Sequence, residues 1–133
     1  MPVRSLNSPV LKWPRRDEVK KALLQWVNTK LATYPEIIRL GYFGSFARDN
    51  WGVGSDLDLI AIIQDSAIAF ERRPLTWNLD MLPVPADILI YTRKEWQDML
   101  KKGGRFVDMI EKEAVWIWPE NSHGPTRTNT DFY

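Results

Sequence analysis

The sequence contains no cysteine and only one histidine, His123. A chain without cysteine forms no disulfide and no thiolate metal site, and one histidine makes no metal site by itself. Lys and Arg number 18 against 17 Asp and Glu, so the net charge of +1 does not favour binding to bulk nucleic acid. The apolar runs are far shorter than a membrane span, and residues 1–6 lack the pattern of a signal peptide. These absences favour a cytoplasmic protein that does not enter a membrane.

The length of 133 residues fits a single domain, and a hydrophobic content of 44% is enough for a buried core. We expect this domain to cover residues 1–119. Residues 120–133 are polar and contain Gly, Pro, Thr and Asn, which predicts a flexible C-terminal tail.

Apolar runs of strand length alternate with segments of helical periodicity. Asp17 is placed to cap the first helix, and Pro74 divides a helical stretch in the middle of the chain. Thr92 and Glu95 form a capping-box signature. This alternation predicts an α/β (α+β) fold, with helices packed against a small mixed β-sheet. The expected helices cover residues 17–32, 67–73, 75–81, 92–102 and 106–113, and the expected strands 37–43, 57–63, 86–91 and 115–118.

Two aspartates, Asp56 and Asp58, stand at the head of an apolar strand. Residues two apart on a strand point to the same face, so these carboxylates should project together. Their mutual repulsion is relieved by a divalent cation, and Mg²⁺ is usually held by one or two carboxylates together with substrate phosphates and water. The pair therefore predicts a magnesium site that binds a polyphosphate.

A third acid, Asp87, lies in the apolar run of residues 86–91. We expect it to be buried there, where an unpaired charge costs several kcal/mol. If its strand neighbours that of Asp56 and Asp58, Asp87 completes a metal site or acts as the general base that accepts a proton from the attacking hydroxyl. The alternative is a structural salt bridge with a basic side chain.

The Gly44-Ser45 turn follows the strand over residues 37–43. Glycine allows the backbone to approach phosphate closely, and the start of a helix presents N–H groups to an anion. Arg48 and Ser55 are candidates for further phosphate contacts, although Arg48 is equally suited to holding the 49–54 loop.

With these motifs the chain resembles the minimal nucleotidyltransferase (MNT) domain family of the DNA polymerase β-like nucleotidyltransferase superfamily. The resemblance covers roughly residues 37–91 and implies a mixed sheet and the transfer of a nucleoside monophosphate to a hydroxyl. It places Gly44 and Ser45 on the phosphate-binding turn, and Asp56, Asp58 and Asp87 on the metal-binding triad. The motifs that carry it are Gly44-Ser45-x-Ala47-Arg48 and Ser55-Asp56-x-Asp58-Leu59.

One position departs from the family pattern. The residue after the arginine is usually glycine, and here it is Asp49, which adds a negative charge near the expected triphosphate. Gly52 and Gly54 follow it and can supply flexibility to the loop.

The function expected from the resemblance is Mg²⁺-dependent transfer of AMP from ATP, or of another nucleotide from its triphosphate. Small members of the family pair with helical HEPN-type proteins, which some of them adenylylate as antitoxins of toxin–antitoxin modules, so a HEPN-type partner or a second copy of the chain is expected. The alternative is a nucleotide-binding subunit with little or no catalysis that neutralises its partner by complex formation. A drug-modifying nucleotidyltransferase fits less well, because such enzymes usually carry an extra helical domain.

Overall fold

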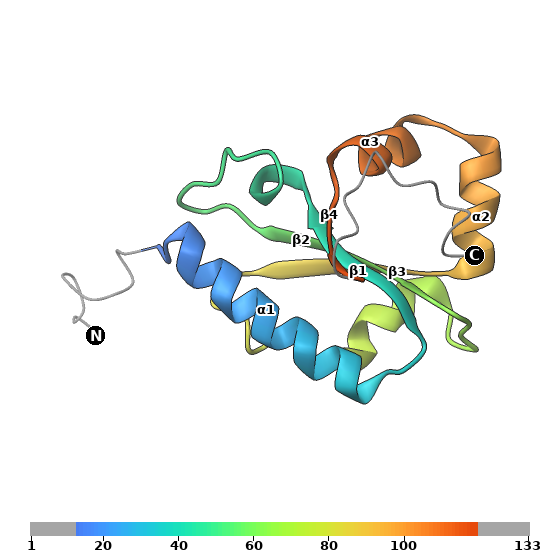
Figure 1. Ribbon diagram of the computed structural model, residues 1–133, viewed down its shortest axis with the longest axis horizontal. Helices are drawn as coiled ribbons and strands as arrows, with labels where there is room; N and C mark the ends of the chain where they lie inside the picture. The colour runs from blue at the N-terminus through green and yellow to red at the C-terminus, as the bar shows by residue number, and fades with distance from the viewer. Residues whose placement is uncertain (1–12, 120–133) are drawn as a thin grey trace.

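The fold is an α/β arrangement in which helices cover both faces of a four-stranded sheet (Figure 1). A computed structural model describes residues 13–119 of the chain. The two terminal segments, and with them His123 and the predicted tail, lie outside the described residues. In chain order the elements are α1 (Arg16–Thr33), β1 (Ile37–Phe43), η2 (Gly44–Phe46), β2 (Leu57–Ile63), η3 (Phe70–Thr76), β3 (Ala86–Thr92), α2 (Arg93–Lys102), α3 (Arg105–Glu113) and β4 (Val115–Trp118), where η denotes a 3-10 helix.

The sheet is mixed, with the strand order β3-β2-β1-β4. β1 pairs antiparallel with both β2 and β4, whereas β2 pairs parallel with β3. The prediction of a small mixed sheet is therefore confirmed. Because β1 runs against β2 and β3, the end of β1 meets the beginnings of the other two strands at one edge of the sheet.

The sheet separates two apolar clusters. The larger one lies between the sheet and α1, and it takes Leu57, Leu59, Ala61 and Ile63 from β2. The smaller one lies under α2 and α3, and it takes Ile60 and Ile62 from the same strand. β2 is therefore buried on both faces, as an apolar run without polar alternation predicts. Since side chains alternate along a strand, Asp58 projects on the face of α2 and α3.

The helix predictions are correct in type for α1, α2 and α3. The capping box at α2 is present, because Oγ1 of Thr92 accepts a hydrogen bond from the Glu95 amide at 3.2 Å and the Thr92 amide donates to Glu95 Oε1 at 2.9 Å. The prediction that Asp17 caps α1 is wrong. The cap position is Arg15, and Glu18 Oε1 accepts its backbone amide at 2.8 Å, so Asp17 lies inside the first turn.

The two helices predicted over residues 67–73 and 75–81 are also wrong. The structure has one 3-10 helix, η3, which contains Pro74, followed by turns. Proline has no amide to donate in an α-helix. The segment is held instead by Arg73, whose guanidinium donates to the carbonyls of Ile68 and Ile90 at 2.8 and 2.9 Å and to both carboxylate oxygens of Glu95 at 2.7 and 2.9 Å. Long-range bonds of this kind override local helical periodicity.

Within residues 13–119, no helix is both long enough and apolar enough to cross a membrane.

Candidate active site

The predicted acids meet at the edge of the sheet where β1 ends and β2 and β3 begin. Asp58 is opposite Phe43 of β1 on one side and opposite Asp87 of β3 on the other. Directly paired residues of neighbouring strands point to the same face, so the carboxylates of Asp58 and Asp87 are adjacent on the side of α2 and α3. Asp56 precedes β2 by one residue.

The electrostatics of Asp58 agree with this strand pairing. Its pKa is raised above the ordinary value of an aspartate, first by burial of its carboxyl group and then by the negative charges of Asp87 and Asp56. The positive charge of Arg48 acts in the opposite direction and lowers this pKa. Asp58 thus lies between two like charges and is itself half-buried, whereas Asp56 and Asp87 are exposed.

Asp87 is not buried, contrary to the expectation from its apolar strand. The side chains of Ile88 and Ile90 are buried on the face of the sheet that α1 covers. Asp87 is at the exposed start of β3 and points to the opposite face. No ion pair within residues 13–119 includes Asp87, so the alternative of a structural salt bridge has no support among them. An exposed carboxylate beside Asp58 is accessible to a ligand.

Gly44 connects the predicted phosphate-binding turn to the acids. Its φ of +76° lies in the left-handed region that favours glycine. A Cβ atom at this position would collide with Oδ2 of Asp58 and would lie 3.2 Å from its Cγ. The backbone therefore favours glycine at this position, and a larger residue would displace the Asp58 carboxylate that packs against it.

The turn that begins at Gly44 is a single 3-10 turn, η2. The carbonyl of Gly44 accepts the amides of Ala47 and Arg48, at 3.0 and 2.9 Å. The first amides of a helical turn have no partner within it, and here they belong to the Gly44-Ser45 segment beside Asp58. Ser45 is half-buried, and its carbonyl accepts the Asn50 amide at 3.2 Å.

Two residues suggested as phosphate contacts have partners within the protein. The exposed guanidinium of Arg48 forms an ion pair with Glu113 of α3, with Nη1 3.3 Å from Oε1. The hydroxyl of Ser55 accepts the Gly52 amide at 3.1 Å and thereby holds the loop before β2. Arg48 still acts on Asp58 through its charge, whereas the bond made by Ser55 is within its own loop.

Asp49 is the one residue other than glycine in the described range with a positive φ, at 67°. A left-handed position strongly favours glycine, and aspartate is among the residues that tolerate it best. The left-handed backbone explains why glycine is usual at this position in the family and why aspartate can replace it here. The carboxylate of Asp49 is largely exposed, and its Oδ1 is 3.7 Å from Nε of Arg16 in α1, so a positive charge offsets it.

Sequence reasoning missed Arg16 and Glu113. Arg16 contacts η2 across 30 residues of sequence, and Glu113 contacts Arg48 across 65. Neither belongs to a motif, and an arginine in the first turn of a helix runs against the usual preference for acids there. No signal in the sequence could have identified them.

The donor set suits a magnesium ion that is shared with a substrate. Among residues 13–119, no group of three or more His, Cys, Asp or Glu side chains is arranged to hold a metal ion alone. Magnesium in phosphate-binding sites does not require such a group, because one or two carboxylates with phosphate and water oxygens complete its shell. Asp56 and Asp58 provide that number.

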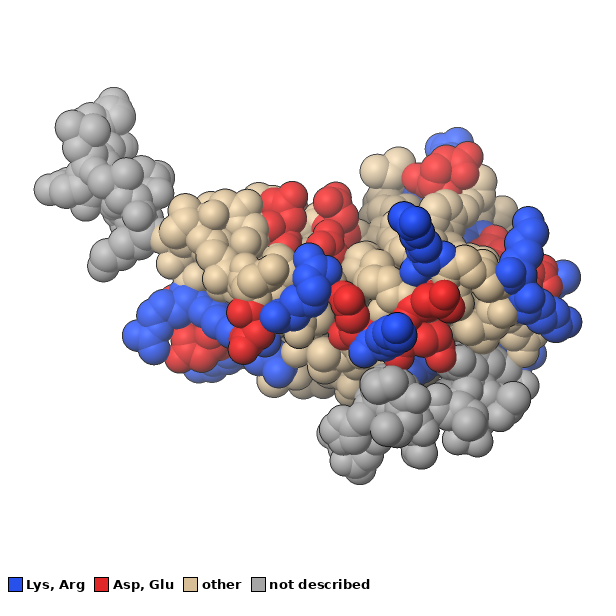
Figure 2. All heavy atoms as spheres, turned by 90° about the horizontal axis from the view of Figure 1, so that it is seen from above, with Lys and Arg blue, Asp and Glu red and all other residues tan. Residues whose placement is uncertain are grey.

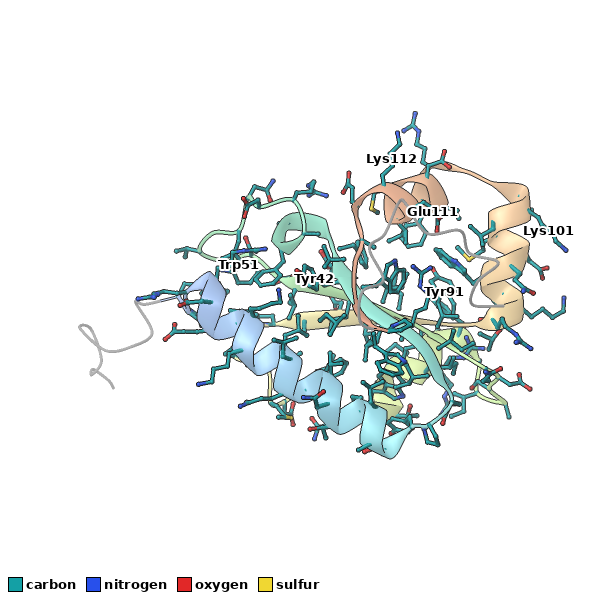
Figure 3. The ribbon with its side chains drawn as sticks, in the orientation of Figure 1. Tyr42, Trp51, Tyr91, Lys101, Glu111 and Lys112 are labelled. Carbon is teal, nitrogen blue, oxygen red and sulfur yellow. The ribbon has the colours of Figure 1, made fainter. Side chains whose placement is uncertain are left out.

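The face of the molecule seen in Figure 2 carries both signs of charge. Figure 2 shows Lys and Arg interspersed with Asp and Glu on the face seen from above, without a continuous basic stretch. Figure 3 shows the side chains on the ribbon, with Trp51 near the start of α1 and Tyr91 beside α2. Trp51 packs edge-on against Phe46 of η2, with ring centroids 5.0 Å apart. Aromatic packing therefore fixes the turn on its α1 side.

One comparison with known proteins shows the family of this chain, and another shows its fold. No curated protein matches the chain. The crystal structure of a candidate nucleotidyltransferase from Sulfolobus solfataricus is similar with a TM-score of 0.57 and 14% sequence identity, over 82% of this chain and 87% of that one. A likeness at this identity shows the fold alone. The family model "Nucleotidyltransferase domain" matches residues 24–117, which include Asp56, Asp58, Asp87 and the glycine turn, and the chain therefore belongs to the nucleotidyltransferase domain family.

Proposed function

We propose that this chain is an Mg²⁺-dependent nucleotidyltransferase that moves AMP from ATP to a hydroxyl group. The observation that carries the proposal is the contact between Asp58 and Gly44, with Asp87 opposite Asp58. This contact brings carboxylate ligands and a phosphate-binding turn to the same point. The choice of ATP rests on the resemblance of the motifs to minimal nucleotidyltransferases.

Asp56 and Asp58 are the residues that would hold the metal. Burial, and then the negative charges of Asp87 and Asp56, raise the pKa of Asp58, and a cation would relieve this repulsion. When bound, Mg²⁺ neutralises phosphate charge and orients the group under attack. The backbone of Gly44 and Ser45 would bind phosphate oxygens through N–H groups. Arg48 is close enough to act on Asp58 by its charge, and it could reach a phosphate by exchanging Glu113 for it.

The reaction breaks one bond and forms one. The acceptor oxygen attacks the α-phosphorus and forms a new P–O bond, while the bond between the α-phosphorus and its bridging oxygen to the β-phosphate breaks and pyrophosphate leaves. The proton of the acceptor hydroxyl needs a base. Asp87 is exposed, is free of ion pairs within residues 13–119, and is opposite Asp58, so we assign this role to it.

We propose that the acceptor hydroxyl belongs to a partner protein, of the helical HEPN type that the motif resemblance implies. The described residues form one sheet with its covering helices and include no additional domain that could bind an acceptor. Three exposed apolar side chains, Ile68, Leu75 and Met81, lie in the connection between β2 and β3 and would suit contact with such a partner.

The test uses ATP labelled on the α-phosphate, Mg²⁺ and the protein encoded next to this chain as the acceptor. The acceptor should become labelled, and ATP labelled on the γ-phosphate should leave it unlabelled, because the γ-phosphate departs in pyrophosphate. The double variant Asp56→Asn/Asp58→Asn should abolish labelling. The control Asp80→Asn/Asp98→Asn removes two exposed acids elsewhere and should retain it. Labelling that survives loss of Asp56 and Asp58 would refute the mechanism.

The second candidate is a nucleotide-binding subunit that covers its partner without catalysis. The small size of the chain motivates it, because there is no room for a dedicated acceptor-binding domain, and the negative charge at position 49 adds to it. The ion pair with Arg16 offsets that charge, and Asp49 stands where the backbone has a left-handed conformation. The two candidates separate in one experiment. A stable complex by calorimetry with an unmodified acceptor by mass spectrometry, after incubation with ATP and Mg²⁺, supports the non-catalytic subunit.

A further inference from the structure

Arg16, in the first turn of α1, makes three contacts with the segment that begins at Gly44. Its Nη1 donates a hydrogen bond to the carbonyl of Phe46 at 2.7 Å. Its guanidinium carbon lies 4.1 Å from the centroid of the Phe46 ring. Its Nε is 3.7 Å from Oδ1 of Asp49. One side chain thus binds the backbone, the ring and the end of this turn.

A single peptide group, between Phe46 and Ala47, connects Arg16 to Gly44 through two hydrogen bonds. The carbonyl of Phe46 accepts from Arg16, and the N–H of the same peptide, on Ala47, donates to the carbonyl of Gly44 at 3.0 Å. Bonds at both ends of one peptide polarise each other and fix the plane of that peptide. The chain of contacts then reaches the acids, because Gly44 packs against the carboxylate of Asp58.

The ring of Phe46 anchors the other side of this arrangement. Phe46 is fully buried and meets Tyr42 and Trp51 edge-on, each with ring centroids 5.0 Å apart. The flat guanidinium of Arg16 stacks on this ring while its N–H groups point to the Phe46 carbonyl. Lysine cannot reproduce both contacts, since its ammonium group is a compact charge without a planar fork.

We propose that Arg16 is a positioning residue, which holds the Gly44-Ser45 turn against Asp58 in the orientation that binds the phosphates of the nucleotide. Arg16 acts through Phe46 and Gly44 and does not touch the reacting atoms. The role rests on the proposed nucleotidyltransferase function only for the identity of the ligand. The contacts that define the position of the turn are independent of it.

The first measurement is hydrogen exchange of the Ala47 and Arg48 amides, which both donate to Gly44. In Arg16→Gln these two amides should exchange about tenfold faster or more. The Phe46–Ala47 peptide loses the hydrogen bond from Arg16, and the turn that both amides close is then held less firmly. The control is Arg15→Gln, since Arg15 is an exposed neighbour that pairs with Asp17 and leaves the turn alone. Arg16→Lys should lie between the wild type and Arg16→Gln. Unchanged exchange in Arg16→Gln would overturn the proposal.

The second measurement separates positioning from general stability. The affinity for Mg²⁺ and a non-hydrolysable ATP analogue, measured by calorimetry, should fall about 10- to 100-fold in Arg16→Gln, as expected for a misplaced binding group. Arg15→Gln should bind like the wild type, and the melting temperature of Arg16→Gln should stay within a few degrees of it. Equal affinity of Arg16→Gln and the wild type would refute the role. If the wild type itself binds no nucleotide, the proposed function fails, and the exchange of the two amides alone decides whether Arg16 fixes the turn.

Discussion

Replacing Asp58 by asparagine should stabilise the nucleotide-free protein while it abolishes nucleotide transfer. Asp58 faces Asp87 across the parallel strand pair, and Asp56 adds a second like charge. No hydrogen bond of the described residues ends on the Asp58 carboxylate, so asparagine loses no partner there and fits the same space against Gly44. The substitution therefore removes repulsion without removing a bond.

The size of the effect follows from the pairing. Opposite charges directly across neighbouring strands stabilise by about 0.2–1 kcal/mol, and we take the same magnitude, with the opposite sign, for like charges, which destabilise. The charge of Asp56 adds to this and that of Arg48 subtracts from it, so a net gain of about 0.5–1 kcal/mol is expected for Asp58→Asn at neutral pH. For a domain of this size, that corresponds to a rise in melting temperature of about 2–5 °C.

The stability gained by Asp58→Asn must depend on pH in a defined direction. The folded-state pKa of Asp58 is raised above that of the unfolded chain, so the folded protein binds this proton more tightly. As pH rises from about 4, the unfolded-state value for aspartate, through the folded-state pKa, the wild type loses stability that the asparagine variant does not lose. The difference between the two proteins should be full at neutral pH and should vanish below about pH 4.

The assay is thermal unfolding of the wild type, Asp58→Asn and Asp56→Asn at several pH values between 3.5 and 8, on the order of the range in which aspartates titrate. Asp56→Asn should stabilise less, because Asp56 is exposed and is not directly opposite another acid. Adding Mg²⁺ and ATP should raise the melting temperature of the wild type and leave Asp58→Asn unchanged. A lower melting temperature for Asp58→Asn at neutral pH, or a gain that persists at pH 3.5, would refute the reasoning.

Three further outcomes are expected. Gly44→Ala should lose nucleotide binding and be less stable than Gly54→Ala, because both positions have a positive φ but only a Cβ at position 44 meets the Asp58 carboxylate; calorimetry and thermal unfolding decide. Asp49→Gly should be about 1 kcal/mol more stable than Asp49→Ala, since the left-handed backbone there disfavours alanine, and equal unfolding free energies would contradict this. Glu95→Gln should destabilise the protein by about 1–2 kcal/mol at neutral pH, because the Arg73 hydrogen bond lowers the pKa of Glu95. The loss of stability relative to the wild type should shrink as pH falls below about 4. Denaturant titrations that give the same loss at every pH would count against this reasoning.

The strands could be predicted from the sequence because each has a strong local signal. β1 and β2 agree with the predicted ranges at both ends, since β2 is apolar on both faces and Gly44 ends β1. The acids of the site could be found for a related reason. Their spacing places two of them on one strand face, and an acid in a following apolar strand points to a neighbouring position.

The rest depended on contacts between distant parts of the chain. The region of residues 64–85 has helical periodicity, but Arg73 binds Ile90 of β3 and Glu95 of α2 and fixes it as a 3-10 helix with turns. The exposure of Asp87 depends on its position at the start of an edge strand, which the apolar composition of residues 86–91 does not reveal. No local pattern encodes either fact.

The stability of this fold and the chemistry of its site act in opposite directions at the same edge of the sheet. Asp56, Asp58 and Asp87 repel one another there, and Gly44 has a positive φ that residues other than glycine rarely adopt. Two interactions with residues outside the motif hold this segment. Arg16 of α1 donates a hydrogen bond to Phe46 of η2, and Glu113 of α3 forms an ion pair with Arg48. Both end on the segment between β1 and β2, so the turn is held from both faces of the sheet, while no ion pair among residues 13–119 includes the three carboxylates. We therefore expect this end of the sheet to favour a cationic ligand, because a bound positive charge offsets the repulsion that the surrounding contacts leave in place.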